Sequence, residues 1–116
     1  MAAKFSWQGA SGRWYEFDIA REKSEWTQTG GVYMFVKPGD YPKMEAGGPV
    51  SLYVAATASF ETSLSRNDRW PDAHDLGARE VHLFVMDDVV KAERVAKDLQ
   101  LAHTPLLNRQ ILKRVA

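Results

Sequence analysis

The sequence predicts a small α+β domain in which an antiparallel sheet is flanked by helices. Four segments carry strand-like patterns, and they cover residues 13–20, 32–37, 50–56 and 79–87. A helical pattern follows over residues 89–103. The connection between the second and third strands is too short for a crossover helix, which favours a hairpin. The 116 residues fit one domain, with three core strands and an added N-terminal strand.

The expected strands differ in their patterns. Residues 13–20 alternate Tyr15, Phe17 and Ile19 with charged side chains and a tryptophan, which is typical of a half-buried strand. Residues 32–37 are rich in β-branched and aromatic side chains, and the turn signal Pro38-Gly39 follows them. A loop rich in Pro and Gly then leads to residues 50–56. We therefore expect a buried hairpin joined to a half-buried N-terminal strand.

Two short helices are expected between the third and fourth strands. Ser59 is a candidate N-cap for the first of them, because its hydroxyl can accept a backbone hydrogen bond. Pro71 suits the first turn of the second helix, and Gly77 suits its C-terminal end. These signals predict two helical turns before the strand at residues 79–87.

The long helix over residues 89–103 has the clearest helical pattern. Asp87 or Asp88 is its expected N-cap, and Pro105 ends it. Glu93 and Lys97 have the favourable spacing and order for an ion pair on the helix surface. Its apolar stripe, which predicts the face that packs on the sheet, consists of Ala92, Val95, Leu99 and Ala102.

Composition excludes several classes of protein. Fifteen basic residues balance fifteen acidic ones, so the whole chain exerts no general attraction on nucleic acid or anionic membranes. The chain has no cysteine, which excludes disulfides and thiolate chemistry. No segment approaches the about 20 apolar residues that a membrane helix needs, and the N-terminus lacks a signal-peptide core. We expect a cytoplasmic protein without a membrane partner.

Several short motifs together resemble the GIY-YIG nuclease domain. The first triplet is Gly31-Val32-Tyr33, and the second is Tyr53-Val54-Ala55. The features that follow the triplets have the family's order and spacing. They are a short helix with Phe60 and Leu64, a strand at residues 80–85, and a helix ending with Leu99-Gln100, Pro105 and Asn108. The resemblance covers roughly residues 30–110. It divides the chain into an N-terminal extension with one strand (1–29), a GIY-YIG-like domain (30–110) and a tail (111–116).

The resemblance implies a fold and a chemistry. The fold is a three-stranded antiparallel sheet flanked by helices. The family hydrolyses DNA phosphodiesters with one divalent metal, using tyrosines of both triplets near the attacking water. An arginine on the first helix stabilises phosphate charge, and a histidine or tyrosine further along assists. A glutamate on the long helix holds the metal, and an asparagine near the end supports the site.

This sequence departs from the family at the reactive positions. Ser63 stands for the arginine and Asn67 for the histidine, while Ala96 stands for the metal-binding glutamate. Alanine has no oxygen ligand for a hard cation, and serine cannot form a bidentate contact to phosphate. Tyr33, Tyr53 and Asn108 are kept, and the second triplet ends in Ala55 instead of glycine. We therefore expect no catalytic residue, no metal and no other cofactor.

The resulting hypothesis is a catalytically inactive GIY-YIG-like domain, a pseudoenzyme that acts as a binding module or an inhibitor. Its partner is a protein or a nucleic acid, and neutrality slightly favours a protein. Candidate nucleic-acid contacts are Tyr33, Tyr53, Arg66, Arg69 and Asn108. The alternative is an active DNA endonuclease that requires Mg²⁺ or Mn²⁺ and uses a displaced ligand such as Glu93. A third possibility is an unrelated α+β domain that only shares these motifs.

Each residue considered for a functional role also has a structural interpretation. Tyr33 and Tyr53 fit half-buried strand positions, and Glu93 is explained by its ion-pair spacing with Lys97. Trp7 is expected either at the surface as a partner anchor or packed on the sheet edge. Other features with a double interpretation are Trp26, the basic tail residues Arg109, Lys113 and Arg114, and the dispersed His74, His82 and His103, for which packing or surface roles are favoured over metal binding.

Overall fold

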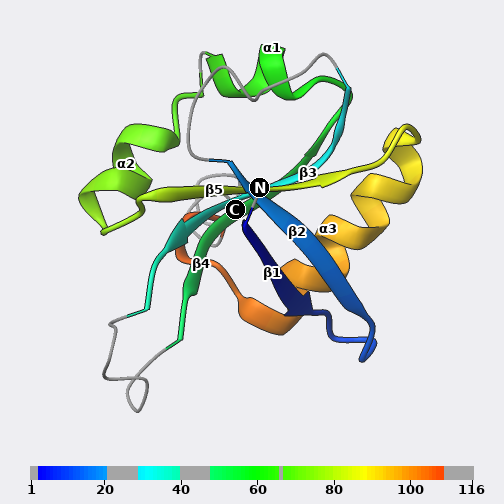
Figure 1. Cartoon of the computed structure of the whole chain (residues 1–116), viewed down its shortest axis with the longest axis horizontal. Coiled ribbons are helices and arrows are strands. Elements are labelled where there is room, and N and C mark those ends of the chain that lie inside the picture. Colours follow the sequence, from blue (N-terminus) through cyan, green and yellow to red (C-terminus); the bar gives the residue numbers. More distant parts are fainter. Residues whose placement is uncertain (1–2, 21–28, 40–47, 66, 109–116) are drawn as a thin grey trace, which may run out of the picture.

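The computed structural model describes residues 3–20, 29–39, 48–65 and 67–108, and it has an α+β fold (Figure 1). A five-stranded antiparallel sheet packs against a long C-terminal helix. In chain order the elements are β1 (Ala3–Gln8), β2 (Trp14–Ala20), β3 (Gly31–Lys37), β4 (Val50–Thr57), α1 (Phe60–Ser65), α2 (Trp70–Asp75), β5 (Glu80–Val85) and α3 (Val89–His103).

The four strands expected from the sequence are all present, and the hairpin between β3 and β4 is confirmed. The expected strand count is wrong by one, because β1 forms a second hairpin with β2. The extension before residue 30 therefore contributes two strands. In β1 the apolar Phe5 and Trp7 alternate with polar neighbours, but this pattern is short and only its pairing with β2 makes a strand of it.

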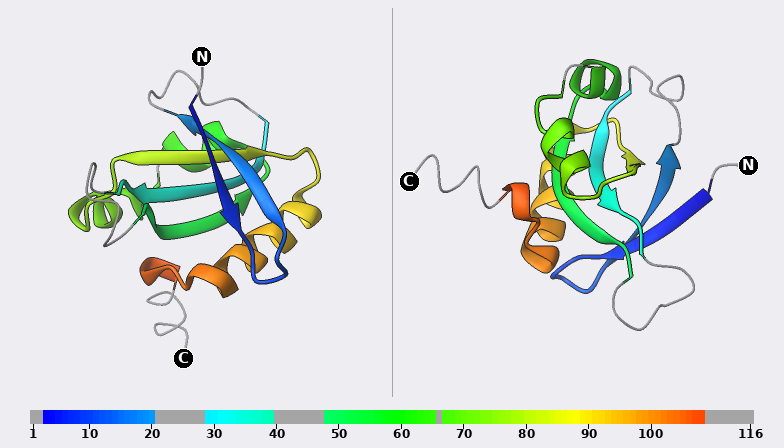
Figure 2. Two further views of the ribbon diagram at one scale, coloured as in Figure 1. Left: turned by 60° about the horizontal axis from the view of Figure 1, so that its bottom comes forward. Right: turned by 90° about the vertical axis from the view of Figure 1, so that its left-hand side faces the viewer.

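The strand order is β1-β2-β5-β3-β4, so β5 joins the two hairpins. β5 pairs with β3 along its whole length, whereas it pairs with β2 only over Asp18–Ala20. Figure 2 shows the consequence, since β1 and β2 run steeply across the direction of the other three strands. The first hairpin can then bend toward α3 and close one side of the core.

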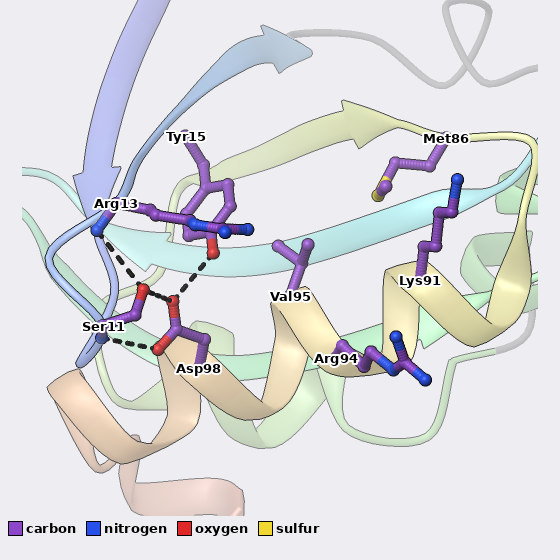
Figure 3. Close-up of a pocket in the computed structure, with 8 residues that line it drawn as sticks. All are labelled: Ser11, Arg13, Tyr15, Met86, Lys91, Arg94, Val95 and Asp98. Carbon is purple, nitrogen blue, oxygen red and sulfur yellow. Dashed lines mark hydrogen bonds between the residues drawn. The ribbon is translucent and has the colours of Figure 1, made fainter.

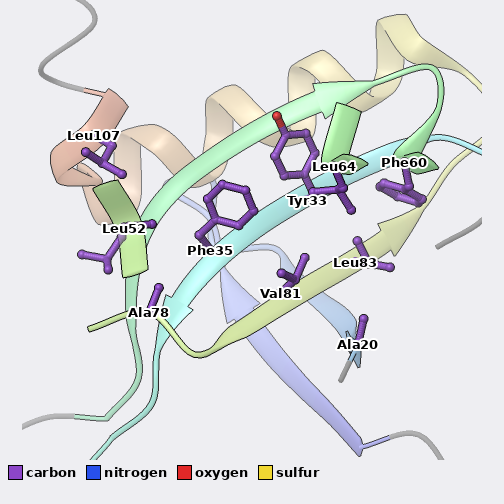
Figure 4. Packing of buried hydrophobic residues seen from close by; sticks show 11 residues of the cluster. Ala20, Tyr33, Phe35, Leu52, Phe60, Leu64, Ala78, Val81, Leu83 and Leu107 are labelled. Atoms are coloured by element: carbon purple, nitrogen blue, oxygen red, sulfur yellow. The ribbon is translucent and has the colours of Figure 1, made fainter. Parts of the chain in front are cut away.

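Strand β3 is buried on both faces and separates two clusters of apolar side chains. Tyr33 and Phe35 point to the face covered by α1 and α2 (Figure 4). Val32, Met34 and Val36 point to the face covered by α3 and the first hairpin. A run of apolar residues without alternation is therefore what the position of β3 requires.

Helix α3 approaches the sheet closely because small side chains line its inner face. Ala92, Ala96 and Leu99 are buried there against Val54 of β4. The helix begins after Asp88, whose Oδ1 accepts hydrogen bonds from the backbone of Val90 and Lys91 at 3.0 and 3.2 Å. Of the two expected N-caps, Asp88 is the one that the structure uses.

Two further local expectations are confirmed. Ser59 Oγ accepts a hydrogen bond from the backbone of Thr62 at 3.3 Å, at the start of α1. α3 ends at His103, two residues before Pro105. Gly31, in the first triplet, has a structural reason to be glycine: its φ is 150°, and a Cβ there would collide with the carbonyl oxygen of Phe84 on β5.

No helix within the described ranges combines the length and the hydropathy that crossing a membrane requires.

Candidate functional site

The two tyrosines of the triplets lie side by side on neighbouring strands. Tyr33 on β3 and Tyr53 on β4 have ring centroids 6.0 Å apart, and Phe35 stacks on Tyr53 at 5.7 Å. Trp70 of α2 meets Phe35 edge-on at 5.0 Å. This aromatic cluster is what the pairing of β3 with β4 predicts, since side chains opposite one another in a sheet share a face.

Tyr33 is largely inaccessible within this cluster. Only 5% of its surface is exposed, and burial raises the pKa of its hydroxyl well above the ordinary 10.0. The neighbouring Tyr53 adds to this rise, and the hydrogen bond from Asn67 opposes it. The hydroxyl therefore stays protonated at neutral pH, and a neutral buried phenol is a poor base for activating water.

Asn67, at the histidine position of the resemblance, is fully engaged in internal hydrogen bonds. Its Nδ2 donates to the Tyr33 hydroxyl at 3.0 Å and to the Ser63 carbonyl at 3.2 Å. Its Oδ1 accepts from the backbone of Arg69 at 2.8 Å. Ser63, at the arginine position, has its hydroxyl hydrogen-bonded to that of Thr57. The structure thus brings Tyr33, Tyr53, Ser63 and Asn67 to one region, where Asn67 bonds to Tyr33 and Ser63 and the Tyr53 ring packs against Tyr33.

Ala96, at the glutamate position, does not join them. It is 3% exposed and packs with Val54 and Leu99 in the cluster under α3, on the opposite face of the sheet from Tyr33. Alternation along β4 is the reason, because Tyr53 and Val54 point to opposite faces. Ala96 therefore does not lie beside the two tyrosines, although the resemblance implies one site for the family's tyrosines and its metal-binding glutamate.

Asn108 has a structural partner. Its Oδ1 accepts from the backbone of Val54 at 2.8 Å, and its Nδ2 donates to the Val54 carbonyl at 2.9 Å. Gln100 of α3 donates to the same carbonyl at 2.9 Å. These bonds satisfy backbone groups on the free edge of β4, a position that otherwise invites pairing with another chain. The amide of Asn108 is consequently occupied.

Among the nucleic-acid candidates that the structure describes, Arg69 is the only cation, and its side chain is mostly covered. The Arg69 side chain is 15% exposed, and its Nη1 lies 4.0 Å from Asp72 Oδ2. Tyr33 is buried, and Asn108 is bonded to β4. Arg66, Trp26 and the tail residues Arg109, Lys113 and Arg114 fall outside the described residues.

Metal coordination by several side chains is not assembled in the described ranges. Among those residues, no group of three His, Asp or Glu side chains lies close enough to hold an ion. Glu93, the displaced ligand of the endonuclease alternative, is exposed on α3. A single carboxylate binds a hard divalent cation weakly, because several oxygen ligands are needed to replace its water.

His82 and Trp7 form a buried pair that the sequence pattern did not reveal. Trp7 Nε1 donates to His82 Nδ1 at 3.0 Å, and His82 Nε2 lies 3.1 Å from Glu80 Oε1. His82 is 0% exposed, and burial lowers the pKa of its imidazole, although Glu80 opposes the shift. Trp7 therefore packs from the first hairpin against β5 and the cluster under α3 instead of standing out as an anchor, and His82 has a packing role.

A second constellation joins the turn of the first hairpin to α3. Asp98 accepts hydrogen bonds from the Ser11 backbone at 2.8 Å, from Ser11 Oγ at 2.7 Å and from the Tyr15 hydroxyl at 2.8 Å. These bonds from Ser11 and Tyr15 hold the pKa of the Asp98 carboxyl below its usual value. No local sequence pattern predicts this contact, because its partners are far apart in the sequence.

No protein-family model, curated protein or solved structure matches this chain.

Proposed function

We propose that this chain is a non-catalytic binding domain whose strands and helices follow the GIY-YIG order, although Ala96 lies on the other face of the sheet from Tyr33. The observation that carries the proposal is the closed hydrogen-bond network of Asn67, which engages Tyr33, Ser63 and the backbone of Arg69. Side chains that saturate one another are not available to position a water or a phosphate. A domain built this way acts through its surfaces.

The residues at the family's phosphate-binding and metal-binding positions support the same proposal. Hydrolysis of a phosphodiester requires groups that neutralise developing negative charge, and their loss costs orders of magnitude in rate. Ser63 supplies no charge at the arginine position, and Ala96 supplies no ligand and lies across the sheet. The resemblance thus implies an active site at which the side chains of this sequence cannot catalyse phosphodiester hydrolysis.

The partner is either a nucleic acid or another protein, with inhibition of that protein as one form of the second case. We favour recognition away from the aromatic cluster, because Tyr33 is buried and Arg69 is mostly covered. Basic side chains that remain accessible gather instead beside the first hairpin and α3. A partner with negative charge is the better match to that surface.

The test is a nicking assay on supercoiled plasmid with Mg²⁺ or Mn²⁺, at protein concentrations in excess of the DNA. We expect no conversion to nicked or linear plasmid, with or without the metal. Metal-dependent cutting that Glu93→Ala abolishes would establish the endonuclease alternative and overturn the proposal. Glu61→Ala is the matched control, since it removes an exposed carboxylate from α1.

A further inference from the structure

A groove lies between the turn of the first hairpin, the end of β5 and helix α3 (Figure 3). Its volume is about 450 Å³, within the range of small-ligand sites. Arg13 extends into it from the hairpin, while Lys91 and Arg94 border it from α3. We call it the hairpin groove. It is on the α3 side of the sheet and shares no residue with the aromatic cluster.

None of the three cations of the hairpin groove forms a close ion pair in the described part of the chain, although the charge of Arg13 contributes to lowering the pKa of Asp98. Ion pairs there involve other basic side chains, and none includes Arg13, Lys91 or Arg94. Lys91 and Arg94 are three residues apart on α3, a spacing that places side chains on neighbouring positions of one helix face. Three cations around one depression that holds a single carboxylate repel each other, so a bound anion would stabilise them.

One carboxylate lines the same groove, and it is already occupied. Both oxygens of Asp98 accept hydrogen bonds, from Ser11 and Tyr15. The groove therefore has three positive charges against one negative charge, in a chain whose formal net charge is zero. The positive charge is a local feature, which is the form that a nucleic-acid or phosphate site must take in a neutral protein.

Apolar groups border the same space. The ring of Tyr15, the thioether of Met86 and the branched side chain of Val95 line the groove between the cations. The Tyr15 ring is held in place by its hydroxyl bond to Asp98 and by an edge-on contact with Phe84 at 5.7 Å. Charged and apolar groups side by side suit a ligand that has an anionic part and a flat apolar part.

We propose that the hairpin groove binds the phosphate group of a nucleotide unit, with the attached base or sugar against Tyr15, Met86 and Val95. The guanidinium groups of Arg13 and Arg94 match phosphate oxygens in pairs, and Lys91 adds a point charge. Stacking of a base on an aromatic ring adds affinity without dependence on sequence. The nucleotide unit is either free or part of a single strand. This inference rests on the proposed function, because it names the ligand class of the basic surface beside the first hairpin, but it does not require the family's active site.

The experiment measures binding of three probes to the full chain at 50 mM salt by titration calorimetry. The probes are a dT10 oligonucleotide, thymidine monophosphate and a peptide of ten glutamates. The test variant is Arg13→Gln with Arg94→Gln, and the matched control is Lys37→Gln with Lys97→Gln, which removes the same charge outside the groove. We expect the test variant to lose about tenfold or more in affinity and the control to stay within about twofold of the unmodified chain.

The three probes distinguish a free nucleotide from a single strand as the source of the bound phosphate group. Binding of both dT10 and thymidine monophosphate assigns a free nucleotide, and binding of dT10 alone assigns a strand; each supports the proposal. Equal weakening by the test and control variants would show general electrostatic attraction and would overturn it. Failure of both nucleotide probes to bind, or equally tight binding of the glutamate peptide, would also overturn it. Thermal melting of both variants verifies that they are folded.

Discussion

Asp98 and Ser11 are joined by two hydrogen bonds, at 2.8 Å to the Ser11 backbone and 2.7 Å to its hydroxyl, although they are 87 residues apart in the sequence. A further bond from the backbone of Ala10 to the Asp98 carbonyl, at 3.1 Å, lies beside them. These contacts fasten the turn of the first hairpin to α3. They form one wall of the hairpin groove, and they explain why the hairpin belongs to the folded domain.

Asp98→Asn should lower the melting temperature at pH 7 and loosen the hairpin. The ordinary pKa of the carboxyl is 3.8, and the native value lies below it because of the bonds from Ser11 and Tyr15. The stabilisation is thus present above pH 3.8 and is lost as the pH falls through the native pKa. Melting curves between pH 7 and pH 3 should show that the difference in melting temperature between the unmodified chain and Asp98→Asn becomes smaller as the pH falls. A difference in melting temperature that does not shrink between pH 7 and pH 3 would contradict this role. Glu93→Gln serves as the control on the same helix.

The buried His82 should make the protein less stable in acid. Burial lowers the pKa of its imidazole below the ordinary 6.5, so the unfolded chain takes up the proton first. Stability is complete above pH 6.5 and declines as the pH falls below it. Urea unfolding at pH 8 and pH 5 measures the difference.

In His82→Leu that decline should be smaller, since the titrating group is absent. The variant should also be less stable at pH 8, because Trp7 Nε1 loses its acceptor. A decline of unchanged size in His82→Leu would assign the acid sensitivity to another group.

Tyr33→Phe should affect stability and leave binding intact. The change removes a buried hydroxyl and takes away an acceptor of Asn67, at a cost of about 1 kcal/mol in the free energy of unfolding. Urea unfolding measures this cost, and titration with dT10 measures binding. Tyr53→Phe is the control, because Tyr53 is the less buried ring of the pair. A loss of dT10 affinity in Tyr33→Phe would instead assign the binding of dT10 to the aromatic cluster.

Asn108→Ala should expose the outer edge of β4. It leaves the Val54 N–H without its side-chain partner, and we expect a loss of about 1–3 kcal/mol in unfolding free energy. An uncovered edge also favours association, so light scattering should detect concentration-dependent oligomers. Gln100→Ala removes one of the two donors to the Val54 carbonyl and should cost less. If the two variants proved equally stable, Asn108 would not be the group that protects this edge.

Local patterns in the sequence determined most of the secondary structure. The strand-like run at residues 32–37, the N-cap Asp88 and the stop at Pro105 each act within a few residues of where they lie, so their effects can be predicted without the fold. The pairing of β3 with β4 is of this kind too, because their short connection permits little else. The adjacency of Tyr33 and Tyr53 follows from that pairing.

Tertiary structure decided the arrangement of the sites. β1 is a strand only because β2 pairs with it, and Ala96 is separated from Tyr33 only because β4 turns Tyr53 and Val54 to opposite faces. The bonds of Asp98 to Ser11 and of Trp7 to His82 join residues that no periodicity connects. Hydrogen bonds and charges between distant segments depend on how the hairpin bends over α3, and that bend results from the packing of the whole core.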